Sequence, residues 1–169
     1  GIVGDGEWAL AELMSAVRRG VGDPARIAGI VYRTGKGEFR RAPWRPGPFA
    51  ALPAFRRALV ENARYYREGG QVGIETKRGC PQGCTYCADP LSKGTVCRLR
   101  PAAKVADEME RLLEQGVEVL HLCDSEFNIP LRHAHAVCQE LTRRGLGERA
   151  KWYTYACVLY TSPSPRDRQ

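Results

Sequence analysis

The first twenty residues show a pattern of apolar and polar positions that predicts one strand followed by one helix. The apolar run GIVGD (1–5) is typical of the end of a strand, with a turn after it. Gly20 is a natural helix end, and the apolar residues before it recur at helical spacing: Trp8, Leu10, Leu13, Met14 and Val17. Because one strand–helix unit cannot bury its own sheet, we expect the chain to begin inside a domain.

Residues 21–53 are rich in proline and glycine, and together with a following helix they predict a linker region over 21–69. The segment IAGIVYRTGKGEFRR (27–41) predicts a hairpin with glycines near its tip. APWRPGP (42–48) predicts a connection with a restricted backbone. The periodicity of PAFRRALVENARYYRE predicts a helix over 53–68 that ends at two glycines.

From Gln71 the pattern changes to alternating strands and helices. Strands are predicted at 71–77, 117–123 and 151–158, and helices at 101–116 and about 131–144. This alternation predicts an α/β fold with parallel βαβ units. In such folds the functional residues lie in the loops after the carboxyl ends of the strands. We therefore expect the site in the loops that begin near Gly79 and Asp124.

The segment 158–169 has no such periodicity and contains two Ser-Pro pairs. It resembles translated adapter sequence. We expect it to be unstructured and foreign to the natural protein, and we assign it no function.

The composition favours a folded protein that does not bind nucleic acid. Hydrophobic residues make up 43% of the 169 residues, which is enough for a packed core. The net charge of +7 comes from 26 Lys and Arg against 19 Asp and Glu. Without interleaved aromatic residues, its scattered arginine pairs are typical of solvated helix surfaces: Arg18-Arg19, Arg40-Arg41, Arg56-Arg57 and Arg143-Arg144.

The cysteines favour a metal or redox role over disulfides. The sequence shows no signal peptide and no apolar run of membrane-spanning length, so we expect a cytoplasmic location. Thiols stay reduced there, and the number of cysteines, seven, is odd.

Three of these cysteines, Cys80, Cys84 and Cys87, form a C-x3-C-x2-C motif directly after a predicted strand. Three thiolates on one short loop can hold one face of an inorganic cluster. The alternatives are a thioredoxin-like pair of thiols, and a structural zinc site. Zinc needs a fourth ligand, for which there are three candidates: Cys97, His121 and Cys123. The cysteines outside the motif are otherwise expected to pack as small apolar residues: Cys97, Cys123, Cys138 and Cys157.

The cysteine motif, with Tyr86 before its last cysteine, resembles the radical S-adenosylmethionine (SAM) superfamily. The resemblance implies that the three thiolates hold a [4Fe–4S] cluster whose unclaimed iron binds the amino and carboxylate groups of SAM. Reductive cleavage of SAM would then give a 5′-deoxyadenosyl radical. It also implies a partial (β/α)6 TIM-like barrel, an electron donor such as flavodoxin or ferredoxin, and a small-molecule or unknown substrate.

The segment DSEFN (124–128) lies where superfamily members contact the amino group of SAM. The resemblance therefore implies Asp124, Ser125 and Glu126 as SAM-binding residues, through side chains or backbone carbonyls, together with Tyr86; Asn128 is a further candidate. The alternative is the acidic first turn of a helix. Of the histidines, His121 is expected in the core or at a sheet edge, and His133 and His135 in solvent.

The GDGE turn (4–7), the hairpin, the proline-rich linker and the cysteine motif together resemble a narrower group, the radical SAM enzymes with an amino-terminal cobalamin-binding domain. The resemblance implies that 1–20 ends a Rossmann-like cobalamin domain, that 21–69 is the linker with its helix, and that 70–157 begins the radical SAM core. Methyl transfer with cobalamin, or a related radical reaction, is the expected chemistry of the full-length enzyme, and this fragment alone is expected to be inactive. The alternatives are a methylthiotransferase-like radical SAM enzyme and a zinc-stabilised binding module.

Overall fold

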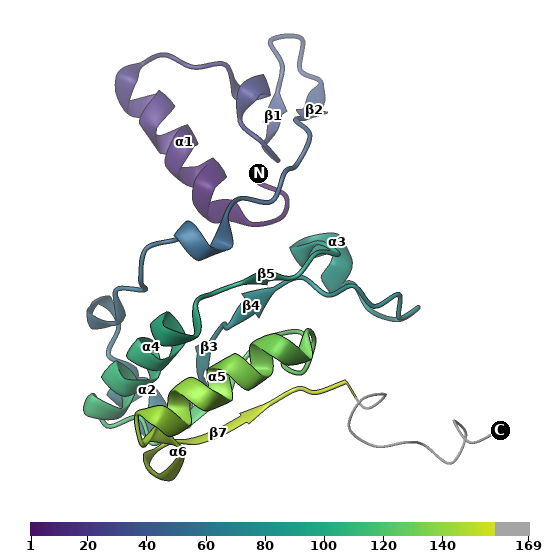
Figure 1. The fold of residues 1–169 in the computed structure, drawn as a ribbon. Helices are drawn as coiled ribbons and strands as arrows, with labels where there is room; N and C mark the ends of the chain where they lie inside the picture. The colour runs from purple at the N-terminus through teal and green to yellow at the C-terminus, as the bar shows by residue number, and fades with distance from the viewer. Residues whose placement is uncertain (158–169) are drawn as a thin grey trace, which may run out of the picture. The chain divides into compact units, whose positions relative to one another are not determined.

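The computed structural model describes residues 1–157, and the predicted tail lies outside them (Figure 1). By their contacts the residues form two compact units: Gly1–Pro48 with Pro81–Thr95, and Phe49–Cys80 with Val96 onward. This division does not test the three functional segments expected from the sequence, which stay predictions.

The amino-terminal unit contains a helix, a hairpin and a short second helix. Its elements are α1 (Gly6–Arg19), a 3₁₀ turn (Pro24–Arg26), β1 (Val31–Arg33), β2 (Phe39–Arg41) and α3 (Asp89–Lys93). The predicted hairpin is confirmed, since β1 pairs antiparallel with β2. α1 ends at Gly20, whose φ of 66° is left-handed. The small core consists of Ala9, Ile27, Ile30 and Ala42.

The strand predicted at residues 1–5 is wrong in its length. Only Ile2 bridges to Ile30, in the antiparallel sense. Gly4 has a φ of +81°, a left-handed conformation that turns the chain out of the ladder and towards α1.

Trp44 packs against glycines from three separate segments of this unit. A Cβ atom added to Gly4 would lie 2.1 Å from the indole Nε1, and one added to Gly29 would lie 2.9 Å from Cδ1. At Gly94, just after α3, the added Cβ would lie 3.3 Å from the indole ring. The three glycines are therefore needed for close approach to one tryptophan, and Trp44 ties the segment after α3 to the rest of the unit.

The second unit is an α/β structure built on a parallel sheet. Its helices and strands are α2 (Asn62–Arg67), β3 (Val72–Ile74), β4 (Lys77–Arg78), β5 (Arg98–Leu99), α4 (Ala102–Glu114), β6 (Val119–Leu122), α5 (Leu131–Arg143), α6 (Leu146–Arg149) and β7 (Lys151–Thr154), with 3₁₀ turns at Phe49–Ala51 and Arg57–Leu59. The sheet order is β3-β6-β7, all parallel, and β4 pairs antiparallel with β5. The predicted βαβ alternation is confirmed.

Helices α4 and α5 lie side by side and supply much of the core of this unit (Figure 1). Val105, Met109 and Leu112 of α4 are fully buried against Leu120 and Leu122 of β6. Because side chains alternate along a strand, the residues between them, such as His121, lie on the other face of the sheet. Among residues 1–157, no helix combines the length and the apolar character needed to cross a membrane.

The helix predicted over 53–68 is wrong, because the chain forms a 3₁₀ turn (Arg57–Leu59) and the shorter α2 instead. The Nδ2 of Asn62 donates hydrogen bonds to the carbonyl oxygens of Arg57 (2.7 Å) and Val60 (3.0 Å). These bonds satisfy carbonyl groups locally and stabilise a break in the helix. The strand predicted over 71–77 likewise splits into β3 and β4.

Glu108 joins three segments of this unit and is fully buried. Its Oε1 accepts a 2.7 Å hydrogen bond from Arg57 Nε, and its Oε2 accepts a 2.7 Å bond from Arg100 Nη2. The same arginines donate to the carbonyl oxygens of Gly73 (2.6 Å) and Glu75 (2.6 Å), which flank the end of β3. The carboxylate of Glu108 on α4 thus fixes both the linker, through Arg57, and the end of β3.

We predict that Glu108→Ala lowers the free energy of unfolding by about 3–5 kcal/mol, because it leaves two arginines without their buried partner. The matched control is Glu114→Ala, at an exposed position of the same helix, which should change stability by less than about 0.5 kcal/mol. Urea unfolding followed by circular dichroism measures both. Equal stability losses in the two variants would contradict the assignment.

Candidate cofactor site

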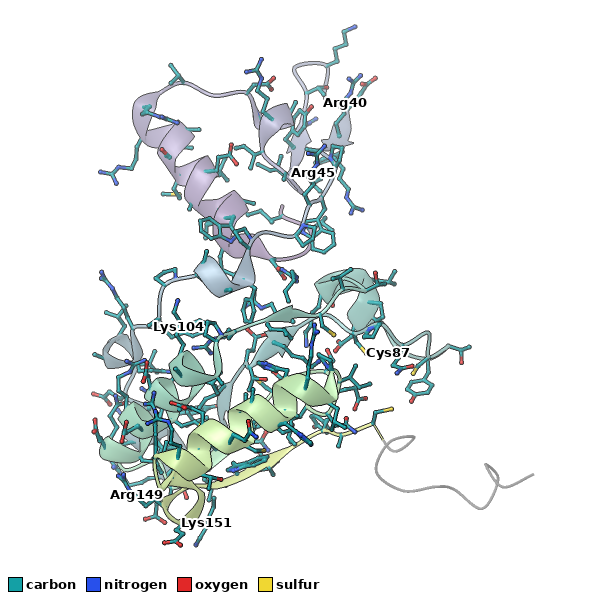
Figure 2. All side chains as sticks on the ribbon, in the orientation of Figure 1. Arg40, Arg45, Cys87, Lys104, Arg149 and Lys151 are labelled. Carbon is teal, nitrogen blue, oxygen red and sulfur yellow. The ribbon has the colours of Figure 1, made fainter. Side chains whose placement is uncertain are left out.

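The three cysteines of the motif differ in exposure. Cys80, two residues after β4, is 5% exposed, whereas Cys84 and Cys87 are exposed. Cys87 N donates to Cys84 O at 3.1 Å, so the second and third cysteines lie on one turn. Figure 2 labels Cys87 in the loop that precedes α3.

The three thiols are divided between the two compact units. Cys80 belongs to the unit of the parallel sheet, and the segment with Cys84 and Cys87 belongs to the other unit. Among residues 1–157, no three His, Cys, Asp or Glu side chains are grouped so that they could hold a metal ion. All the cysteines are free thiols. The donor set still fits an iron–sulfur cluster, because three soft sulfur ligands lie within eight positions and two of them are accessible.

The backbone before Cys80 is tightly held. Gly79 has a φ of +89°, which favours glycine, and it is buried. Its carbonyl oxygen accepts hydrogen bonds from Lys77 Nζ (3.4 Å) and from Cys97 Sγ (3.5 Å). Burial raises the pKa of the Cys97 thiol, and the nearby Lys77 ammonium opposes that rise. Cys97 is therefore part of the support of the cysteine loop.

Asp124 fastens the loop after β6 to the segment that leads to Cys80. It is 2% exposed. Its Oδ1 accepts from Thr76 N (2.7 Å) and Lys77 N (3.1 Å), and its Oδ2 accepts from Thr76 Oγ1 (2.5 Å). These bonds engage both oxygens of the side chain. A contact between Asp124 and SAM stays a prediction. Because both side-chain oxygens are already engaged, the backbone carbonyl groups of this loop would have to make that contact.

His133 completes this buried group, and its predicted exposure is wrong. It is 5% exposed, and its Nε2 lies 3.1 Å from both the carbonyl oxygen and the Oγ1 of Thr76. The signal in the sequence was its helical spacing, because His133, Val137 and Leu141 share one face of α5 and the last two are buried. His135 is exposed, as expected.

The other predicted SAM-binding residues lie at or near the surface. Ser125 and Glu126 are partly buried in the loop after β6, and Tyr86 is 91% exposed. Asn128 forms two hydrogen bonds with the backbone of Cys157, at 2.8 and 3.1 Å. These bonds join the loop after β6 to the chain after β7, so the first role of Asn128 in this structure is to hold two strand-end loops together.

Sequence reasoning missed the cluster of side chains on the sheet face opposite α4 and α5. The His121 ring stacks on Tyr153 with centroids 4.6 Å apart, and Tyr155 meets it edge-on at 5.5 Å. On β3, a Cβ added to Gly73 would lie 3.2 Å from Cys123 Sγ. His121 and Cys123 thus lie on the same face of the sheet.

We predict that Asp124→Ala destabilises the sheet unit by about 1–3 kcal/mol for each buried donor left without an acceptor. Glu118→Ala, at an exposed position just before β6, is the matched control and should be close to neutral. Chemical denaturation measures the difference. A neutral Asp124→Ala variant would show that its hydrogen bonds do not hold the loop.

We also predict that the protein loses stability as the pH falls below about 6.5, in part through His133. Burial lowers the pKa of His133 below its ordinary value of 6.5, although the Thr76 carbonyl and Asp124 oppose the shift. The unfolded chain therefore takes up the proton first, so this contribution is complete above the ordinary pKa and declines below it. The decrease in urea midpoint between pH 7.5 and 5.5 should be smaller in His133→Gln than in His135→Gln. Equal decreases would contradict this.

Comparisons with known proteins place these features in a family. No protein-family model matches the chain. Tryptophan 2-C-methyltransferase of Streptomyces laurentii is 40% identical over 129 residues, which are 70% of this chain and 20% of that protein. The chain therefore spans about a fifth of the length of this relative.

Solved structures agree. The chain matches the radical SAM methyltransferase TsrM of Kitasatospora setae with cobalamin and a [4Fe–4S] cluster bound, with a TM-score of 0.77, 32% identity, and coverage of 92% of this chain and 33% of that one. A second TsrM structure, with tryptophan and the SAM analogue aza-SAM bound, matches with a TM-score of 0.76 and 33% identity over 92% of this chain and 32% of that one.

The cobalamin-dependent SAM radical enzyme OxsB shares the fold, with a TM-score of 0.73 at 20% identity over 88% of this chain and 21% of that one. The sequence relationship to the methyltransferase and the shared fold together confirm the resemblance seen in the cysteine motif and the GDGE turn. The chain belongs to the cobalamin-dependent radical SAM enzymes.

Proposed function

We propose that this chain is the junction between the cobalamin-binding domain and the radical SAM core of a methyltransferase that acts on a small molecule. α1 would be the last helix of the cobalamin domain, and β3, β6 and β7 would be the first three strands of a partial (β/α)6 barrel. The cysteine motif carries the proposal, and the 40% identity to a tryptophan methyltransferase supports the reaction class.

Cys80, Cys84 and Cys87 would hold a [4Fe–4S] cluster that leaves one iron for SAM. When bound, the cluster would supply the electron that cleaves SAM to a 5′-deoxyadenosyl radical, and cobalamin would supply a transferable methyl group. Three thiolates suit this role because an iron without a protein ligand is an open coordination position, as in catalytic metal sites.

The residues of this chain would position the cofactors. Asp124 and His133 fix the segment that precedes Cys80, while the backbone of the loop after β6 and the Ser125 and Glu126 side chains are the proposed contacts for the ammonium of SAM. Tyr86, between the second and third cysteines, is 91% exposed and therefore accessible to a ligand. The electron would come from a donor such as flavodoxin or ferredoxin.

The sheet face that carries His121, Tyr153 and Tyr155 is the proposed side for substrate. In parallel barrels the inward-facing strand residues lie beneath the active site. Tryptophan, which one solved relative binds, is a reasonable first substrate to test with a full-length protein. A methylthiotransferase-like activity stays the alternative prediction.

We predict that the chain, reconstituted under anaerobic conditions with iron and sulfide, gains a brown chromophore that bleaches in air. Cys84→Ala should lose most of the bound iron and the chromophore, because two thiolates cannot hold the cluster stably. Cys138→Ala removes a free cysteine of α5 outside the motif and should keep both. Iron and zinc content, measured by elemental analysis, decides the assignment.

Zinc at one equivalent without iron would favour the zinc-stabilised binding module and contradict the proposal. A chromophore that persists unchanged in Cys84→Ala would likewise show that the motif does not hold it. These outcomes can be read without any enzymatic activity.

A further inference from the structure

Lys77 is a buried cation that no step described so far uses. It lies on β4, three residues before Cys80, and is 1% exposed. Within residues 1–157, its Nζ has one hydrogen-bond acceptor, the Gly79 carbonyl oxygen at 3.4 Å, and forms no ion pair. An ammonium group has three protons to donate, and a buried charge is costly unless it is compensated.

The Lys77 ammonium is directed at the peptide unit that carries the first cysteine of the motif. The Gly79 carbonyl, which it contacts, belongs to the peptide bond between Gly79 and Cys80. Cys97 Sγ contacts the same oxygen at 3.5 Å, and Cys80 is itself 5% exposed. The cation therefore lies close to Cys80, in surroundings from which water is largely excluded.

The nearby carboxylate of Asp124 does not compensate the buried Lys77 ammonium by a direct contact. Asp124 accepts hydrogen bonds from the backbone of Lys77 and from Thr76, and it makes no ion pair with the Lys77 side chain. The backbone bonds would form with any side chain at residue 77. The burial of an ammonium here thus calls for a negative group on the cysteine side of the segment.

An iron–sulfur cluster would be such a group. Three thiolates make a [4Fe–4S] cluster net negative, and reduction adds one further negative charge. A cation in a low-dielectric environment interacts strongly with that charge, and the net charge around a cluster sets its potential. The cation favours the reduced state over the oxidised state, which raises the reduction potential.

Resting on the proposed function, we propose that Lys77 is a positioning residue for the cluster. It holds the peptide before Cys80 and stabilises the reduced cluster, so that the electron donor can reduce it.

The test is a redox titration, followed by electron paramagnetic resonance, of the reconstituted chain and two variants. Lys77→Met replaces the cation with an apolar side chain of similar length and should fold. Lys151→Met removes a cation from an exposed position on β7 of the same unit and is the matched control (Figure 2). At a fixed applied potential, the ratio of reduced to oxidised cluster should fall about tenfold in Lys77→Met, equivalent to about 59 mV for one electron. In Lys151→Met it should change less than twofold.

An unchanged ratio in Lys77→Met, with iron content equal to wild type, overturns the proposal even if the variant is less stable, because Lys77 would then be structural only. A wild-type chain that binds no iron–sulfur cluster instead overturns the proposed function, and this inference with it. The two failures are therefore distinguishable.

Should Lys77→Met not fold, the wild-type chain decides. In protein labelled with ¹⁵N at lysine only, the reduced cluster should show a weak hyperfine coupling to a lysine nitrogen, and Lys151→Met should keep it. Lys77→Arg, which retains the charge but replaces that nitrogen by unlabelled ones, should lose the coupling. Absence of any lysine coupling in the wild type would overturn the proposal.

Discussion

The carboxylate of Asp124 is the interaction on which the rest of the site depends. It follows the central strand of the parallel sheet, and it accepts three hydrogen bonds from Thr76 and Lys77, which follow the neighbouring strand. A parallel sheet brings the carboxyl ends of its strands to one edge, but it does not fix the loops that leave them. Asp124 supplies that constraint. The cysteine loop begins from a backbone that is already positioned by a buried charge.

The second constraint is the buried carboxylate of Glu108 on α4. Glu108 engages Arg57 and Arg100, and these arginines bind the carbonyl oxygens at the end of β3. The backbone at the end of β3 is thus held by two sets of contacts. Asp124 binds the residues that follow the strand, and the two arginines link its carbonyl oxygens to Glu108 on α4. Buried ion pairs often contribute little net stability, but here the two arginines position the backbone at the end of β3. A site that must hold a cofactor at a defined place needs this positioning.

The sequence predicted those parts of the fold in which one strong pattern decides the structure. The helices α4 and α5 and the strand β6 have clear periodicities, and the structure confirms them. The helix predicted over 53–68 was wrong because Asn62 binds the backbone carbonyls of Arg57 and Val60, an interaction that periodicity cannot show. The prediction that His133 faces solvent was wrong because it followed the polarity of the side chain. The helical spacing of His133 with the buried Val137 and Leu141 indicated the opposite.

The candidate site shows the same division. The spacing of the three cysteines predicts a set of cluster ligands, because such a motif is local in sequence. The supporting shell is not local: Asp124 and His133 lie 48 and 57 residues from Thr76, which both of them contact. No short motif contains such pairs. The sequence alone could therefore propose Cys80, Cys84 and Cys87 as ligands, but it could not identify Asp124 and His133 as the residues that hold the segment before Cys80 in place.

The packing of Trp44 against three glycines limits which residues can stand at those positions. Three glycines from separate segments meet one indole ring, and any of them would need the ring to shift before it could gain a side chain. All three glycines also have a positive φ, and a side chain at Gly29 would meet the carbonyl oxygen of Val3 at 2.6 Å, so a smaller residue at position 44 would not by itself make these glycines replaceable. The segment that follows α3 is therefore held by a backbone constraint that extends to residues 4 and 29, far from it in the sequence.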